Sequence, residues 1–290
     1  MGSMEEQSVK QCCAAFYGSD LARLLLGDSF HPGGTALTQR LGVLLCINPE
    51  STVLDVASGR GTSAFHLAES FGCHVAGVDL SEENVRLATD EAARRGISTQ
   101  VRFQVGDAER LPFDDCTFDS ILCECAFCTF PSKKIAAEEF LRLLKPGGHL
   151  GLSDLTRSEE AIPELEGLLS WIACIGDALP IHRYTGILEA AGFQIRTHED
   201  HSDALSEMAR QIQGKLLGAE IMAGLKKIDL PGVNFATARQ FARAALDATG
   251  QRKLGYAVIL AQRLEGKDTA GRSESVGERS IDRTCRHPRL

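Results

Sequence analysis

A glycine-rich turn is the part of the sequence whose residue types and spacing are best suited to bind a ligand. The run Val53–Ala64 begins as an apolar strand, turns at Gly59 and Gly61, and continues with a helical pattern. Glycine allows a tight turn and lets the backbone approach a ligand where a Cβ atom would collide. The spacing also partly fits the fingerprint of dinucleotide-binding proteins. The turn therefore predicts a ligand site at the end of a strand but does not identify the ligand.

Three carboxylates narrow the choice of ligand. Asp79 ends the second apolar run, where a carboxylate can accept hydrogen bonds from both hydroxyls of a ribose. Asp107 ends the third run, where it can accept the amino group of an adenine. Asp55 lies inside the first strand, where it would repel a pyrophosphate and attract a cation. Because S-adenosylmethionine carries a sulfonium and an ammonium group, the set favours it over a nicotinamide dinucleotide.

Taken in order, the motifs of this region resemble the class I methyltransferases. The resemblance rests on Asp55–Gly61, Asp79, Asp107-Ala108 and the turn Lys145–Gly148. It implies that Asp79 binds the ribose, that Asp107 lies near the adenine, and that the glycines surround the methionine part of the cofactor. The expected cofactor-binding residues are Asp55, Ala57 (where the family most often has glycine), Ser58, Gly59, Gly61, Asp79, Leu80, Asp107, Ala108 and Cys123.

Apolar runs alternate with helical patterns along most of the chain, which is typical of a parallel sheet covered by helices. The predicted strands are Thr52–Ala57, His74–Leu80, Val101–Gly106, Asp119–Cys125, Gly148–Asp154, Phe193–Thr197 and Gly255–Ala261. The predicted helices among them include Thr62–Phe71, Glu82–Arg95, Lys133–Leu144 and Tyr184–Ala191. We therefore expect an α/β fold: a Rossmann-like class I methyltransferase sheet with helices on both faces, an N-terminal helical segment, and a helical insertion before the last strand.

The same patterns divide the chain into five segments. These are an N-terminal helical segment or cap (1–48), an S-adenosylmethionine-binding Rossmann-like domain (49–202), a helical insertion (203–250), the final strand of the sheet (251–264), and a polar tail expected to be disordered (265–290). In the insertion, an apolar stripe is formed by Leu205, Met208, Ile212, Leu216 and Met222. We expect this stripe to pack onto the sheet domain rather than to bind a partner.

The composition excludes several classes of protein. The 290 residues are 43% hydrophobic and 24% charged, as in ordinary globular domains, and the net charge is −8. An acidic chain with scattered Lys and Arg offers no basic face to nucleic acid or to a membrane surface. No apolar run approaches the roughly 18 residues of a transmembrane helix, and the first residues do not resemble a signal peptide. We expect a cytoplasmic protein with a small-molecule substrate, and its oligomeric state stays open.

The ten cysteines do not fit a disulfide framework. Several lie inside apolar runs, where a thiol behaves as a small hydrophobic group. Cys123, Cys125 and Cys128 follow the fourth predicted strand, but their spacing is not that of a zinc site, so no metal is expected.

A narrower resemblance concerns the arsenite methyltransferases. It rests on Phe16–Gly18, the run Asp119–Pro131 with Cys125, Ser153-Asp154, and the segment Trp171–Leu179 with Cys174. That family binds trivalent arsenic through cysteine thiolates, which are soft ligands for a soft centre. The resemblance implies Cys174 and Cys125 as the catalytic residues. The N-terminal cysteine of the family has no counterpart here, because the turn Phe30–Pro32 stands in its place.

Methyl transfer from a sulfonium makes modest demands on the protein. The cofactor carries the reactivity, and a general base is needed only when the acceptor arrives protonated. His31 and Tyr17 precede the sheet and are interpreted as a surface-loop histidine and a packed tyrosine, with a role at the substrate site as the alternative. His182 and Arg183 lie in a loop after the fifth strand, where substrate contact and a solvated loop are equally consistent with the pattern.

The sequence thus predicts a small-molecule methyltransferase. A trivalent metalloid is the first substrate expectation, and a quinone-like or natural-product acceptor is the alternative. A nicotinamide-dependent oxidoreductase and a non-catalytic thiol sensor remain as distant alternatives.

Overall fold

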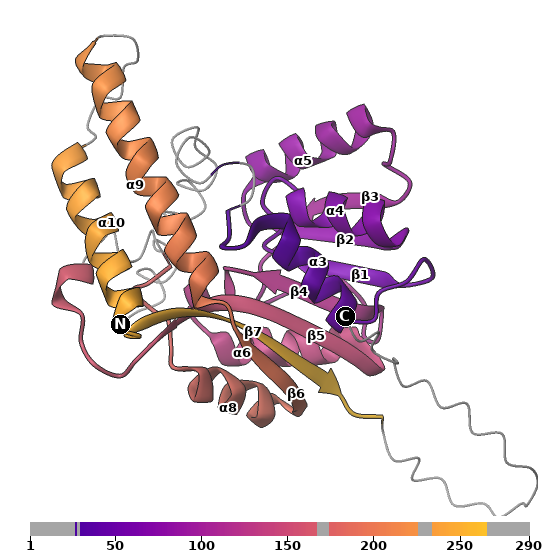
Figure 1. Cartoon of the computed structure of the whole chain (residues 1–290). Coiled ribbons are helices and arrows are strands. Elements are labelled where there is room, and N and C mark those ends of the chain that lie inside the picture. Colours follow the sequence, from indigo (N-terminus) through magenta and orange to yellow (C-terminus); the bar gives the residue numbers. More distant parts are fainter. Residues whose placement is uncertain (1–26, 28–29, 167–173, 226–233, 266–290) are drawn as a thin grey trace, which may run out of the picture.

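The computed structural model describes residues 27, 30–166, 174–225 and 234–265 (Figure 1). Within them, seven strands form one sheet in the order β3-β2-β1-β4-β5-β7-β6. Their bounds are β1 Thr52–Val56, β2 His74–Asp79, β3 Val101–Val105, β4 Phe118–Glu124, β5 Leu144–Arg157, β6 Phe193–Asp200 and β7 Leu254–Arg263. Strand β7 runs antiparallel between β5 and β6, and the pairs among β1 to β5 are parallel.

Helices cover both faces of this sheet. The described helices are α3 Gly34–Leu44, α4 Thr62–Phe71, α5 Glu82–Arg95, α6 Lys133–Leu143, α8 Ile181–Ala191, α9 Ser202–Gly224 and α10 Phe235–Gly250, with the short turns η1 Phe127–Thr129 and η2 Pro163–Leu165. Figure 1 shows α3, α4 and α5 on one side of the sheet and α6 and α8 on the other. The predicted α/β architecture is confirmed.

The helix ends follow ordinary capping chemistry. Ser81 begins α5 by accepting the backbone N–H of Asn84, and Gly96 ends it in the left-handed conformation that glycine favours. Because such signals are local, the predicted bounds of α4 and α5 agree with the structure at both ends. The predicted fifth strand was too short, since β5 already begins at Leu144 and includes the Lys145–Gly148 turn.

The helical insertion differs from the expectation. Helices α9 and α10 pack against each other and project away from the sheet (Figure 1). Both helices contact β7. Leu216 of the predicted stripe is buried, whereas Met222 is 42% exposed. Helix α9 as a whole contacts α10 more extensively than the sheet, and Leu205 at the start of the stripe packs against the main core. Periodicity reveals an apolar face but does not say which element covers it.

Some predictions fall on residues that the structure does not describe. Tyr17, Trp171 and nearly all of the polar tail lie in the ranges 1–26, 167–173 and 266–290, outside the described residues. None of the helices in the described ranges is long and apolar enough to cross a membrane. The division into five segments stays a prediction.

The position of the site follows from the sheet order. Strand β1 pairs with β2 on one side and with β4 on the other, so the chain changes direction across the sheet at this point. In open α/β sheets, ligands bind outside the carboxyl ends of the strands at such a switch point.

Candidate active site

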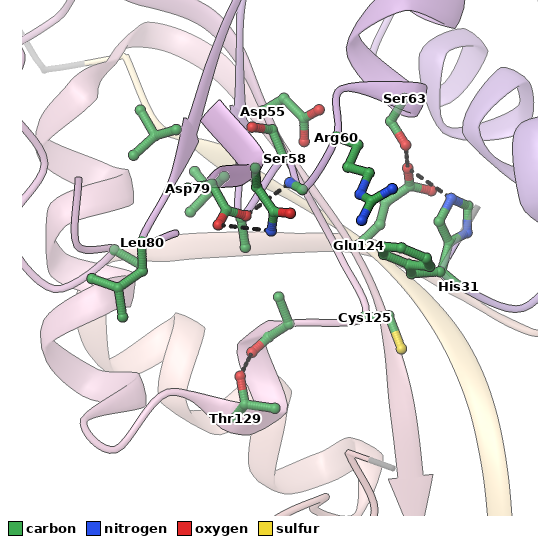
Figure 2. A pocket seen from close by; sticks show the side chains of 18 of the residues that line it. His31, Asp55, Ser58, Arg60, Ser63, Asp79, Leu80, Glu124, Cys125 and Thr129 are labelled. Atoms are coloured by element: carbon green, nitrogen blue, oxygen red, sulfur yellow. Dashed lines mark hydrogen bonds and ion pairs between the residues drawn. The ribbon is translucent and has the colours of Figure 1, made fainter. Parts of the chain in front are cut away.

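An open cleft lies at the carboxyl ends of β1, β2, β3 and β4, with an empty volume of about 1180 Å³ including its mouth (Figure 2). Most of the predicted cofactor residues line it, namely Asp55, Ala57, Ser58, Gly59, Asp79, Leu80, Asp107 and Ala108. Two further predicted residues, Gly61 and Cys123, are not among the lining residues. The structure therefore brings eight separate positions of three strand ends to one cavity.

The turn after β1 is held in an unusual backbone conformation. Gly59 and Gly61 have φ angles of 55° and 84°, and Ala57 has a φ of 58°, which is uncommon for a residue with a side chain. A Cβ atom on Gly61 would come within 2.5 Å of the Phe103 ring. Gly61 is therefore required by packing and by the start of α4, whereas Gly59 lies at the cleft itself.

Asp79 ties the ends of two strands together. Its Oδ2 accepts the backbone N–H of Gly59 at 2.8 Å, and its Oδ1 accepts those of Ser81 at 2.8 Å and of the Asn84 side chain at 3.3 Å. Burial raises the pKa of the Asp79 carboxyl, while these N–H groups act in the opposite direction. The residue thus holds the glycine turn in place and presents a carboxylate to the cleft.

Asp55 is a buried acid with spare hydrogen-bonding capacity. It is 2% exposed and accepts the backbone N–H of Ala64, and its Oδ2 has no hydrogen-bond partner among the described residues. Burial, followed by repulsion from Glu124 and Asp79, raises the pKa of Asp55 well above its ordinary value. A cation in the cleft would offset that repulsion, so this arrangement suits a positively charged ligand.

Glu124 and His31 form a polar cluster that the sequence interpretation missed. Glu124 ends β4, and its Oε2 accepts the hydroxyls of Ser63 at 2.6 Å and Thr38 at 3.0 Å. His31 Nε2 lies 3.4 Å from the same oxygen, and the His31 and Glu124 side chains are 7% and 4% exposed. His31 is therefore buried at the cleft wall rather than in a surface loop, because the turn before α3 folds over the end of β4. An acidic residue at the end of an apolar strand was the available signal.

The cysteines after β4 meet a cysteine from a remote segment. The Cys174 thiol lies 3.7 Å from the backbone carbonyl of Cys125, across 49 residues of sequence, and hydrogen-bonds to the thiols of both Cys125 and Cys128. Cys125 lines the cleft, whereas Cys174 and Cys128 lie behind it and are 2% and 0% exposed. The structure thus brings the two predicted catalytic cysteines together and adds a third.

The surroundings of Cys125 and Cys128 disfavour their ionised forms. The Cys174 hydrogen bond and burial raise the pKa of Cys125 well above its ordinary value, and burial and Cys174 do the same for Cys128. Asp154 lies beside them, accepts the backbone N–H of Cys128 at 2.8 Å, and has its pKa raised to about 7 by burial. A negative neighbour of this kind disfavours a thiolate.

Two other predicted positions lie away from the cleft. Cys123 is completely buried within β4, where its pairing with Val56 of β1 and Leu152 of β5 places it inside the core. Its expected cofactor contact therefore has no support from the geometry. His182 and Arg183 lie in the first turn of α8 rather than in a loop, and both are exposed, which agrees with the solvated alternative.

The chain resembles known proteins over most of its length. The methyltransferase domain family matches residues 47–192. A protein of Haemophilus influenzae is 33% identical over 168 residues, and this chain spans 66% of its length with 56% of its own. The O-methyltransferase cnsE of Penicillium expansum is 27% identical over 234 residues, which cover 80% of this chain and 79% of that protein.

Among solved structures, the [4+2]-cyclase SpnF superposes with a TM-score of 0.71 and 23% identity, over 89% of this chain and 97% of SpnF. At that identity the likeness shows the fold alone. The family match covers half of the chain, includes the glycine turn and the ends of β1 to β4, and agrees with the sheet order. The chain therefore belongs to the methyltransferase domain family, as a class I S-adenosylmethionine-dependent methyltransferase.

Proposed function

We propose that this chain transfers a methyl group from S-adenosylmethionine to a hydroxyl-bearing small molecule that binds beside the carboxyl end of β4. The observation that carries the proposal is the acidic cleft: Asp55 Oδ2 and Glu124 Oε1 are buried in its wall without hydrogen-bond partners among the described residues. A buried, unpaired carboxylate oxygen is costly unless a ligand compensates it. A cationic cofactor provides that compensation for Asp55, and a hydroxyl group of the acceptor provides it for Glu124.

The lining residues fit the parts of this cofactor. Asp79 offers a carboxylate for the ribose hydroxyls, and Leu80, which is 40% exposed, offers an apolar surface next to it. Asp107 lies at the end of β3, where an adenine amino group would be accepted, and Asp55 faces the cationic part. When bound, S-adenosylmethionine supplies an activated methyl group, so the protein has mainly to orient the acceptor and exclude water.

The acceptor class is supported by the name of one of the relatives. The name of the Penicillium protein describes an O-methyltransferase, and its match extends over four fifths of this chain. Of the two substrate expectations, a quinone-like or natural-product acceptor can carry the oxygen that such a name requires, whereas trivalent arsenic is not methylated on oxygen. Glu124 adds a group that a protonated hydroxyl acceptor would need, and a lone-pair acceptor such as arsenic would not.

A trivalent metalloid remains a second candidate, because three thiols converge at the cleft wall. Cys125 is accessible from the cleft, and Cys174 and Cys128 lie directly behind it. A soft centre can displace the thiol protons on binding, even where the pKa of the free thiol is raised. The metalloid would first bind the Cys125 sulfur and would then be ligated by the sulfurs of Cys128 and Cys174 as well.

A transfer assay with methyl-labelled S-adenosylmethionine tests both candidates. One arm contains phenolic and hydroxylated natural-product acceptors, and the other contains arsenite with excess glutathione. Calorimetry of S-adenosylhomocysteine against NAD checks the cofactor separately, with micromolar binding of the former expected. Transfer to arsenite alone would favour the second candidate. Tight NAD binding without binding of S-adenosylhomocysteine would overturn the proposal.

A further inference from the structure

The two oxygens of Glu124 have very different surroundings. Oε2 accepts hydrogen bonds from Ser63 and Thr38 and faces His31, whereas Oε1 has no partner among the described residues. The side chain is 4% exposed, so water does not readily satisfy the second oxygen. Three side chains from separate segments therefore fix one oxygen and leave the other available to a ligand in the cleft that Glu124 lines.

The cluster lies away from the nucleoside end of the cleft. Figure 2 shows Leu80 and Asp79 towards one side and Glu124 and His31 towards the other, with Cys125 below them. Since Asp79 is expected to hold the ribose and Leu80 to contact the cofactor next to it, Glu124 stands at the end that remains for the acceptor. The residue is thus placed to touch the group that is methylated.

We propose that Glu124 is the general base of the transfer and that His31 is the residue that positions it. This inference rests on the proposed function and specifies its acceptor, a hydroxyl that arrives protonated. The acceptor oxygen forms a bond to the methyl carbon, and the sulfur–methyl bond breaks with its electron pair remaining on sulfur. The hydroxyl proton passes to Glu124 Oε1, which later releases it to solvent.

Hydrogen bonding assigns the two roles. His31 Nδ1 lies 3.2 Å from the carbonyl oxygen of Pro32, and Nε2 lies 3.4 Å from Glu124 Oε2. Nε2 also lies 3.5 Å from the Thr38 hydroxyl, so both ring nitrogens already have polar neighbours within the protein. Glu124 Oε1 is the free acceptor of the cluster. His31 therefore acts through Glu124.

Other ionisable groups share this environment. Asp55 of β1, Cys123 of β4 and Tyr256 of β7 interact electrostatically with Glu124, and Arg60 lines the same cleft. A pH profile of the reaction consequently reports on the coupled group rather than on one residue.

The test compares Glu124→Gln with Glu199→Gln. Glu199 also pairs with a histidine, His201, at 3.0 Å, but it does not line the cleft, so its variant controls for loss of a glutamate beside a histidine. We expect Glu124→Gln to lower kcat about 100-fold with a phenol of ordinary acidity. The affinity for S-adenosylhomocysteine should stay within about twofold, and Glu199→Gln should keep wild-type turnover.

Acceptors of different acidity distinguish a general-base role of Glu124 from a purely structural one. A nitrophenol that is already ionised at the assay pH needs no base, so the defect of Glu124→Gln should shrink to less than about tenfold. A structural role predicts equal losses with both acceptors. His31→Asn, which leaves the carboxylate in place with only the Ser63 and Thr38 hydroxyls to position it, should show the same trend with a smaller loss.

A measurement without turnover completes the test. Nitrogen NMR of the His31 ring, with S-adenosylhomocysteine bound, should show ring signals that change in Glu124→Gln, because the ring loses its carboxylate neighbour, and that stay the same in Glu199→Gln. Equal losses with both phenols, or an unchanged His31 ring, would refute the general-base role while the methyltransferase assignment stands. A wild type that binds S-adenosylhomocysteine but methylates no hydroxyl would instead refute the acceptor class, and the base with it.

Discussion

The two ends of the cleft are built in different ways. At the cofactor end, the Asp79 carboxylate accepts backbone N–H groups of Gly59 and Ser81. These three residues lie at or just after the ends of β1 and β2. At the acceptor end, Glu124 is held by the side chains of His31, Thr38 and Ser63, and Cys125 by Cys174, which come from distant parts of the sequence. A site made by local backbone geometry suits a constant ligand. A site made by side chains can change its acceptor without disturbing the cofactor.

The largest expected effect concerns Asp154, which is buried beside the cysteines of the acceptor end. It measures how much stability the folded protein loses when this carboxyl group ionises. Burial raises the pKa of Asp154 from 3.8 to about 7, so the folded protein resists its ionisation. This residue's contribution to the free energy of unfolding is complete below pH 4 and is lost as the pH rises to about 7. The shift corresponds to about 4 kcal/mol. Urea unfolding of the wild type and of Asp154→Asn between pH 4 and 8 measures it.

The Asp154→Asn protein should lose much less stability than the wild type over that range. Asp55 and Asp79, whose pKa values are also raised, remain in both proteins, so the difference isolates residue 154. Asp90→Asn, an exposed position on α5, provides the matched control. If the free energy of unfolding depends on pH in the same way in the wild type and in Asp154→Asn, ionisation of Asp154 has no measurable cost, and the prediction is wrong.

The next prediction concerns the cofactor end. Asp79→Ala removes the acceptor of the Gly59 and Ser81 N–H groups and the expected partner of the ribose. Affinity for S-adenosylhomocysteine should fall by about 1.5–3 kcal/mol in calorimetry. Asp90→Ala on the exposed face of α5 should leave it unchanged. Unchanged affinity in Asp79→Ala would remove the distinction between the two ends.

The third prediction separates the two acceptor candidates. Cys174→Ser replaces a soft donor by a hard one within the buried thiol cluster. Any methylation of arsenite should be abolished, whereas methylation of a hydroxyl acceptor per folded molecule and cofactor affinity should be retained. Stability should fall by about 1 kcal/mol, as for an ordinary buried cysteine.

Cys73→Ser is the matched control, because Cys73 is equally buried and does not line the cleft. It should show the stability loss alone. Arsenite methylation that survives in Cys174→Ser would exclude the metalloid site.

The difference between the two ends also explains what the sequence could predict. The strand–turn–helix signals around Gly59, Asp79 and Asp107 are local, so the fold and most of the residues that line the cleft could be predicted from their spacing. The contact of His31 with Glu124 depends on how the turn before α3 crosses the end of β4, and no local pattern encodes that crossing. Cys174 and Cys125 were paired by resemblance to a family, and Cys128 was left out because its contact to Cys174 is a matter of packing. The covering of α9 by α10 was missed for the same reason.

The smallest expected effect tests whether the cofactor turn carries backbone strain. Ala57 has a φ of 58° and lines the cleft, so its side chain occupies a conformation that costs an L-residue about 1–2 kcal/mol. Ala57→Gly relieves this strain but adds freedom to the unfolded chain, which costs about 0.5–1 kcal/mol. The net gain in the free energy of unfolding should be about 0.5 kcal/mol, measured by urea titration, with S-adenosylhomocysteine affinity equal or slightly higher. Gly61→Ala is the opposing variant, since its Cβ would meet the Phe103 ring and its φ is 84°, and it should destabilise the fold. If Ala57→Gly instead lowers the free energy of unfolding, as an alanine-to-glycine substitution does at a position with negative φ, the packing of the alanine methyl group outweighs the strain.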